Sequence, residues 1–184
     1  MEIFWSEGYE PASVSKLCAA MEIKVPSLYA AFGSKARLFL EAVRHYEERY
    51  WGAAWDRLGS EPDAFRAVSG FFMEAARTLS SPESPCGCLV VLGATNVSST
   101  GHELDATLKA MRKEGEERFL NRVRRGIVDG QLSHRTDAIG LAATLNTLLQ
   151  GMSVQARDGA SIAELERIAL FVVDLMPRAN PARI

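Results

Sequence analysis

The sequence predicts an all-α protein, in which an N-terminal three-helix unit is followed by a C-terminal helical bundle. Apolar residues recur at helical spacing along nearly the whole chain, and alternating runs of β-branched residues are scarce. Capping residues at helix starts and Gly or Pro residues at helix ends divide the chain into segments of helical length. We place the boundary inside a long helix near Tyr46, so that the first unit spans 1–46 and the second 47–184.

Serines and capping boxes predict where the helices start. Ser13 and Ser34 precede apolar helical runs, and Ser60 is followed by an early Pro and an acidic residue. Capping boxes begin at Thr100 and Ser161, each with a Glu three residues later. The predicted helices are three short ones up to about residue 31, followed by 35–58, 62–79, 87–97, 101–129, 137–157 and 162–176, with a loop over 80–87.

Composition excludes several classes of protein. The 184 residues are 47% hydrophobic and 24% charged, which rules out wholesale disorder and fibrous repeats. The longest apolar run, 88–94, is far shorter than the ~20 residues that a membrane span needs, and no basic-then-apolar leader opens the chain. Three cysteines do not make a disulfide framework. We therefore expect a soluble cytoplasmic protein without a membrane partner.

Charge is unevenly distributed along the chain. The net charge of −2 argues against non-specific coating of nucleic acid. The segment 11–46, however, carries five basic and two acidic residues, a local charge of +3. Such an asymmetry is expected if one end of the protein meets a polyanion.

Two short helices joined by about three residues form a helix-turn-helix arrangement in the N-terminal unit. The first covers 14–21, and the second has Pro26 in its first turn, where a missing N–H costs nothing. Leu28 and Phe32 are spaced to point inward. Because the second helix of such a motif enters the DNA major groove, we expect DNA contacts from the residues left facing outward: Val25, Pro26, Ser27, Tyr29 and Ala30.

The N-terminal motif resembles the DNA-binding domain of the tetracycline-repressor (TetR/AcrR) family over residues 4–46. The residues that carry the resemblance are Phe4, Gly8-Tyr9-Glu10, Ser13-Val14, the run PSLYAAFGSK over 26–35, and Leu38-Phe39. The resemblance implies a homodimeric transcription factor that binds a double-stranded DNA operator and an unknown small-molecule effector. By position it implies phosphate contacts from Ser27, Tyr29 and Lys35, and places near base edges for Lys24, Val25, Pro26 and Ala30, with Ser15 as a further candidate.

Three features depart from the family pattern. Glu22 stands where the family has a Gly that favours left-handed geometry, so an altered turn is expected. Lys24 replaces the usual capping Ser or Asn, and Met1 falls inside the expected first helix, as if roughly ten to fifteen residues preceded it. The alternative interpretation is a helical ligand-binding or protein-binding dimer that has lost operator binding.

The last two predicted helices each carry an apolar stripe. Two wide stripes exceed what one small domain must bury, so a partner surface is expected, with ordinary core as the alternative. Dimers of the resembled family form four-helix bundles from these two helices, which favours an interface. The residues expected in it are Leu141, Leu145, Leu148, Met152, Leu165, Ile168, Val172 and Leu175.

An effector pocket is expected among the aromatic and Met residues of the bundle, although most such residues serve as core. Trp51 and Trp55 lie one helical turn apart and can face one cavity. The charged run 112–125 mixes both signs and is interpreted as a solvated helix face. The candidate lining residues carry no clustered charge, so we expect a small apolar or amphipathic effector, contacted by Trp51, Trp55, Phe71, Phe72, Met111 and Phe119.

No spacing of residues indicates catalysis, a metal centre or a cofactor. Cys86 and Cys88 have no second pair of ligands to complete a zinc site, and the three histidines are scattered. A small buried residue is favoured over a redox role for these cysteines. We expect a binding protein that is not an enzyme.

Overall fold

The computed structural model describes residues 1–93 and 102–179, and within these ranges every regular element is a helix. A single antiparallel bridge joins Leu132 and Arg178. The predicted all-α fold class is confirmed. No helix in the described residues is both long enough and apolar enough to span a membrane.

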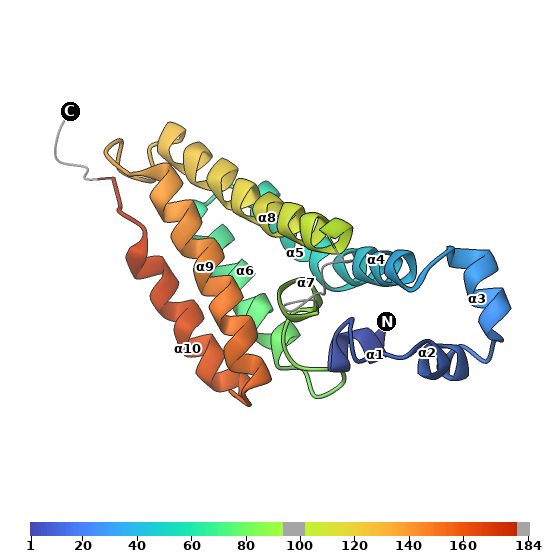
Figure 1. Cartoon of the computed structure of the whole chain (residues 1–184). Coiled ribbons are helices and arrows are strands. Elements are labelled where there is room, and N and C mark those ends of the chain that lie inside the picture. Colours follow the sequence, from blue (N-terminus) through green and yellow to red (C-terminus); the bar gives the residue numbers. More distant parts are fainter. Residues whose placement is uncertain (94–101, 180–184) are drawn as a thin grey trace.

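Three short helices lie together at one end of the molecule (Figure 1). They are α1 (Glu2–Glu7), α2 (Val14–Ala20) and α3 (Val25–Phe32). The side chain of Ser13 caps α2 by accepting a hydrogen bond from the Lys16 amide at 3.2 Å. Ser34 does the same for α4 (Lys35–Tyr46), where it accepts from the Arg37 amide at 3.1 Å. These caps satisfy N–H groups that the first turn leaves unpaired, as the sequence predicts.

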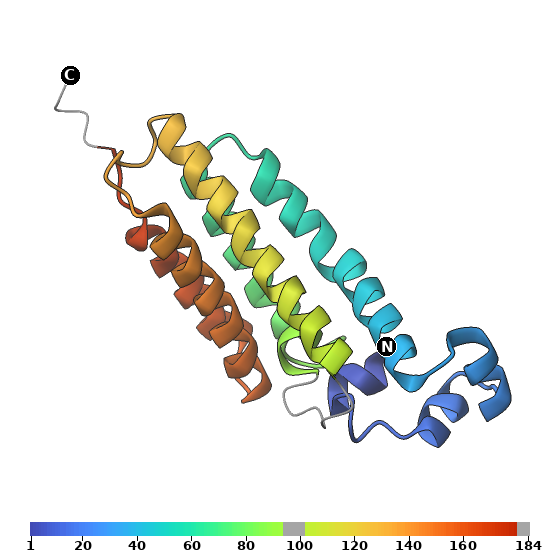
Figure 2. The same ribbon diagram turned by 45° about the horizontal axis from the view of Figure 1, so that its top comes forward.

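The predicted helix over 35–58 contains a π-helical turn. α4 runs into the π-helix η1 (Glu47–Trp51), which continues as α5 (Gly52–Ser60). The Gly52 amide donates to the carbonyl of Glu47, five residues earlier. This path leads from the N-terminal helices into the bundle, as Figure 2 shows, with one irregular turn near its middle. Such π-turns are frequent at functional sites.

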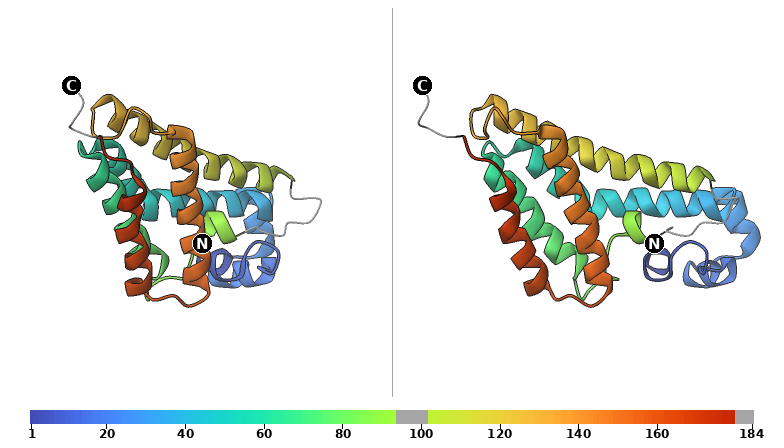
Figure 3. Two further views of the ribbon diagram at one scale, coloured as in Figure 1. Left: turned by 90° about the vertical axis from the view of Figure 1, so that its left-hand side faces the viewer. Right: turned by 60° about the vertical axis from the view of Figure 1, so that its left-hand side comes forward.

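The bundle is completed by α6 (Ala64–Leu79), α7 (Leu89–Leu92), α8 (His102–Val128), α9 (Ala138–Arg157), α10 (Ile162–Val172) and the 3₁₀ turn η2 (Val173–Leu175). α10 packs against α6, and α9 packs against α8 (Figure 3). The expected cap of α6 is corrected, because Asp63 rather than Ser60 accepts from the amides of Phe65 and Arg66. The box of Ser161 and Glu164 is confirmed, whereas Thr100 and residues 94–97 of the predicted helix 87–97 lie outside the described residues.

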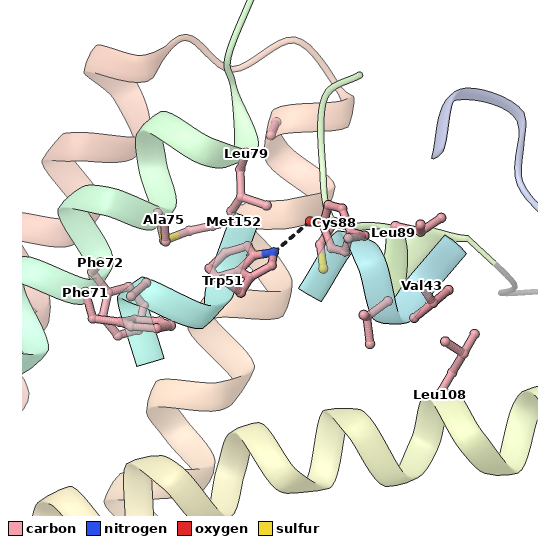
Figure 4. Packing of buried hydrophobic residues seen from close by; sticks show 14 of the residues in the cluster. Val43, Trp51, Phe71, Phe72, Ala75, Leu79, Cys88, Leu89, Leu108 and Met152 are labelled. Atoms are coloured by element: carbon pink, nitrogen blue, oxygen red, sulfur yellow. Dashed lines mark hydrogen bonds between the residues drawn. The ribbon is translucent and has the colours of Figure 1, made fainter. Parts of the chain in front are cut away.

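Aromatic contacts join the N-terminal helices to the bundle. The Trp5 ring is fully buried and meets the rings of Tyr46 and Tyr50 edge-on, with centroids 4.7 and 4.9 Å apart. Its indole N–H donates to the Gly87 carbonyl at 2.8 Å. Figure 4 shows the neighbouring part of the core around Trp51, whose indole N–H donates to the Tyr46 hydroxyl at 2.8 Å. Displacement of α4 near Tyr46 must therefore disturb both parts of the molecule.

Candidate DNA-binding surface and effector pocket

The turn between α2 and α3 contains one residue in the left-handed backbone conformation. Glu22 itself adopts φ 55°, so the altered turn expected from the loss of a Gly is not seen. An L-residue in this conformation costs roughly 1–2 kcal/mol. Lys24 takes the N-cap position of α3 without a capping side-chain hydrogen bond, as its replacement of Ser or Asn predicts.

One face of α3 is held inside and the other faces solvent. Leu28 is fully buried against the N-terminal core, and Phe32 packs partly against it. Tyr29 and Val25 are 46% and 41% exposed, although both are large. The exposed set contains every residue of α3 and its cap that was expected to face DNA: Lys24, Val25, Pro26, Ser27, Tyr29 and Ala30.

The two remaining DNA-contact candidates already have partners within the subunit. The Ser15 hydroxyl is exposed and lies 3.0 Å from the Ser13 hydroxyl. The ammonium of Lys35 donates to the Glu10 carbonyl at 3.1 Å and lies 4.5 Å from the centroid of the Tyr9 ring. Partial burial lowers the pKa of Lys35, while the charge of Glu10 opposes that shift. Lys35 therefore fastens the start of α4 to the loop before α2, and it keeps further N–H donors for a phosphate.

A pocket opens in the bundle beside η1. Trp51 and Trp55 form one wall, α8 contributes Met111 and Gly115, and about 60 Å³ of space remains inside. Three expected lining residues are corrected, because Phe71, Phe72 and Phe119 are at most 2% exposed and do not line it. They pack together behind Trp55. The centroid of the Trp55 ring lies 4.3 Å from that of Phe71, which is tilted against it, and 5.4 Å from that of Phe119, which meets it edge-on.

Charged groups line this pocket, contrary to the expectation that it lacks them. Glu47, Arg112, Glu114 and Arg118 all contribute to the wall, together with the amide of Asn146. The run 112–125 was interpreted as a solvated face, but one edge of α8 turns toward η1 and α5. The spacing of the charges along α8 could have revealed this edge only if the position of η1 had been known.

The pocket charges have defined partners. Arg112 donates through Nη1 to the Val90 carbonyl at 2.9 Å. Arg118 donates to Glu114 at 2.6 Å, and its guanidinium lies 5.3 Å from the centroid of the Trp55 ring. At that distance the guanidinium attracts the negative face of the indole.

Burial changes the protonation of two groups at the pocket. It raises the pKa of Glu47 to about 7, although Arg118 and a hydrogen bond from Trp55 oppose the shift and Glu114 adds to it. Burial, with the nearby charge of Glu47, raises the pKa of the Cys88 thiol to about 11. A thiol with such a pKa remains protonated near neutral pH and is a poor nucleophile. No group of three or more His, Cys, Asp or Glu side chains among the described residues could hold a metal ion.

Two family profiles match this chain. The profile for bacterial regulatory proteins of the tetR family matches residues 1–42, and that for the tetracyclin repressor-like C-terminal domain matches residues 64–170. The chain belongs to the TetR family. It is accordingly a transcriptional regulator with an N-terminal helix-turn-helix domain, and the family resemblance of its first 46 residues is confirmed.

Individual TetR-family proteins match along nearly the whole chain. The HTH-type transcriptional repressor ComR of Escherichia coli (strain K12) is 32% identical over 181 residues, covering 96% of this chain and 85% of ComR. BdcR, a repressor from the same organism, is 28% identical and covers 89% of this chain and 78% of its own. A cysteine mutant of the regulator CifR, in complex with 26-bp double-strand operator DNA, has a TM-score of 0.91 and 40% identity, covering 96% of this chain and 92% of that chain.

Five of the eight residues expected from the sequence in the dimer interface are buried within the single subunit of this TetR-family fold. Leu141, Leu145, Met152, Leu165 and Val172 are at most 9% exposed within the single subunit, because α9 packs on α8 and α10 packs on α6. Leu148 and Ile168 are half-buried, and only Leu175 is well exposed, at 48%. The sequence analysis missed the large apolar side chains that face outward on these two helices: Ile139, Val154, Leu170 and Phe171.

Proposed function

We propose that this TetR-family regulator is a homodimeric repressor that binds a double-stranded operator through α3 and releases it when a small molecule enters the pocket beside η1. The observation that carries the proposal is one continuous helical path, α4–η1–α5, with the DNA-facing helix at one end and the pocket along its length. The protein would act in the cytoplasm by binding rather than by catalysis. If the chain is divided into a DNA-binding unit over 1–46 and a ligand-binding and dimerisation unit over 47–184, the boundary between the two units falls at Glu47, the first residue of η1.

DNA contact is assigned to the outward face of α3. Tyr29 and Ser27 offer hydroxyl groups that suit phosphate oxygens. Val25, Pro26 and Ala30 present only apolar surface, which suits a thymine methyl group better than bidentate reading of a base edge. Operator half-sites for such a motif lie about 34–36 Å apart, so two copies of α3 must keep a matching separation.

The dimer is assigned to the outward faces of α9 and α10. Phe171 is 71% exposed and Leu170 is 65% exposed, which is costly for aromatic and branched side chains in a lone subunit. Val154 on α9 and Leu175 in η2 extend the apolar surface. A self-complementary contact between two such faces would generate a twofold-symmetric dimer, matching a pseudo-palindromic operator.

The switch is assigned to η1. Glu47 and Trp51, its first and last residues, both line the pocket, while the adjacent Tyr46 packs against Trp5 of α1. A ligand controls DNA affinity only if it binds two conformations differently. Ligand pressed against Trp51 would shift η1, and α4 would carry the displacement to α3 and change the separation of the two recognition helices.

Selection of bound fragments from genomic DNA tests the operator assignment. The full-length protein should enrich fragments that share a pseudo-palindrome, and the Tyr29→Ala protein should lose affinity for them at least tenfold. A control, Val128→Ala, truncates an exposed side chain on α8, far along the chain from α3, and should leave operator affinity unchanged. No enrichment by the folded, dimeric parent protein would overturn the proposal and favour a dimer without operator binding.

A further inference from the structure

The pocket contains the parts of a site for an organic cation. Two indole rings, those of Trp51 and Trp55, stand 6.4 Å apart at an interplanar angle of 35°. The carboxyl group of Glu47 opens onto the same space. Aromatic faces beside a carboxylate attract alkylated ammonium ions, which shed their hydration shell readily.

Glu47 lacks a cation of its own. No Lys, Arg or His of the described residues lies within ion-pair distance of its carboxylate. The charged and titratable groups that act on it are Arg118 and Glu114 from α8, Cys88 from the turn before α7 and Tyr46 at the end of α4. Trp55 donates a hydrogen bond to it. Arg118 is paired with Glu114, and Arg112 is engaged by the Val90 carbonyl.

A positively charged side chain of the protein itself already covers one face of the Trp55 ring. The Arg118 guanidinium lies over the ring of Trp55. The side chains of Arg118 and its partner Glu114 are 42% and 58% exposed. Arg118 can therefore swing into solvent and keep its ion pair with Glu114. That movement would widen a space of about 60 Å³, which is smaller than most ligand pockets. One aromatic face of the pocket is therefore covered by a group that can be displaced.

We propose that the effector pocket takes a small amphipathic organic cation, whose alkylated ammonium group lies between Glu47 and the Trp51–Trp55 wall in place of the Arg118 guanidinium. This inference rests on the effector role proposed above for the same pocket. An anionic ligand is disfavoured because Glu47 and Glu114 would repel it, and both arginines already have partners. A neutral ligand would gain nothing from the ionised form of Glu47, whereas a cation would be attracted to it.

Choline and 3,3-dimethylbutan-1-ol test the charge requirement at constant shape. They differ only in the replacement of the quaternary nitrogen by carbon, and neither titrates between pH 6 and pH 8. Binding to the full-length protein is measured by calorimetry and by Trp fluorescence. We expect choline to bind at least tenfold more tightly than the alcohol at pH 8. The same or greater affinity for the alcohol would overturn the proposal.

The pH dependence and three variants locate the cation. Because the pKa of Glu47 is about 7, ionised carboxylate rises roughly tenfold between pH 6 and pH 8, and choline affinity should rise by about the same factor. Glu47→Gln should remove this rise and weaken choline binding about tenfold at pH 8, while Glu48→Gln, an exposed neighbour in η1, should change neither. Arg118→Gln should strengthen binding by uncovering Trp55. Unchanged choline affinity in Glu47→Gln, or weaker binding in Arg118→Gln, would contradict the assignment.

Operator release separates this inference from the proposed function. If the protein binds its selected operator and a neutral or anionic compound releases it while choline does not bind, the cation site is wrong and the repressor function stands. If choline binds with the expected pH dependence but no ligand of this class affects operator binding, the cation site stands and the proposed switch fails.

Discussion

The ammonium of Lys35 lies where α4 begins and has two neighbours within the subunit, the Glu10 carbonyl and the Tyr9 ring. A residue matched by sequence to a phosphate contact thus also holds the loop between α1 and α2. Glu47 likewise combines two properties, because it begins η1 and places a carboxyl group in the pocket. Single residues at the ends of α4 therefore couple local structure to binding.

Lys35→Ala should weaken DNA binding on all sequences and lower the slope of log affinity against log salt by about one, because one phosphate contact is lost. Loss of the bond to Glu10 should add a further decrease that does not depend on salt. The measurement is operator affinity across a salt series, with Lys109→Ala on the exposed surface of α8 as control. An unchanged slope in Lys35→Ala would show that this ammonium does not meet a phosphate.

Glu47 should make the protein less stable as pH rises. Burial raises its pKa from 4.5 to about 7 in the folded state, so the folded protein binds more protons than the unfolded chain between these values. The contribution of Glu47 is present in full below about pH 4.5 and is lost as the pH passes 7, a decrease of about 1–3 kcal/mol after allowance for the open side of the pocket.

Denaturant unfolding at several pH values measures this effect. Glu47→Gln should match the parent protein near pH 4.5 and exceed its stability at pH 8, because the amide carries no charge to desolvate. Glu48→Gln controls for a general change of charge in η1. If the difference between the Glu47→Gln and parent proteins stays constant from pH 4.5 to pH 8, Glu47 does not titrate as described.

The irregular turn η1 distinguishes the path α4–η1–α5 from a straight helix. A π-turn bonds each amide to a carbonyl five residues back and adds one residue to the turn. Gly52 follows it with φ −51° and ψ −54°, ordinary helical values. A glycine in such a conformation leaves the junction freer than any other residue would.

Gly52→Ala should stabilise the protein by about 0.5–1 kcal/mol, because a Cβ there meets only the Glu47 carbonyl oxygen at 3.9 Å and the unfolded chain loses freedom. Gly70→Ala in α6, where a Cβ meets nothing within 4 Å, is the matched control and should stabilise to a similar extent. If η1 transmits the effector signal, only the change at Gly52 should also raise the effector concentration needed for operator release. Equal effector responses in both variants would argue against η1 as the moving segment.

The apolar surface of α9 and α10 is the interface that we propose for the dimer. Phe171 and Leu170 face outward, whereas Leu165 and Val172 of the same helix are buried against α6 and its neighbours. α5 lies on the opposite side of the bundle (Figure 2). A dimer formed through α9 and α10 would therefore leave α5 uncovered.

Phe171→Glu should convert the dimer to monomers that remain folded. In a twofold interface the change introduces two carboxylates, and desolvating them costs several kcal/mol, enough to weaken dimerisation by about a hundredfold or more. Light scattering gives the mass, and circular dichroism checks the helix content. Ala53→Glu, on the exposed surface of α5, is the control and should remain dimeric. A dimeric Phe171→Glu protein would place the interface elsewhere, whereas Val172→Glu should unfold the subunit because Val172 is 1% exposed.

Most helix starts and the outward face of α3 follow from the sequence alone. Caps such as Ser13 and Ser34, and the spacing of Leu28 and Phe32, act within a few residues, so local periodicity is sufficient to predict them. Which apolar stripe of α10 is core, and which charges of α8 face the pocket, depend on how the helices pack together. Val172 and Phe171 are adjacent in sequence and similar in hydrophobicity, and their burial depends on where α6 lies. Glu47, Glu114 and Arg118 meet at one pocket because α8 packs beside η1, a contact between segments far apart in the sequence that no local pattern contains.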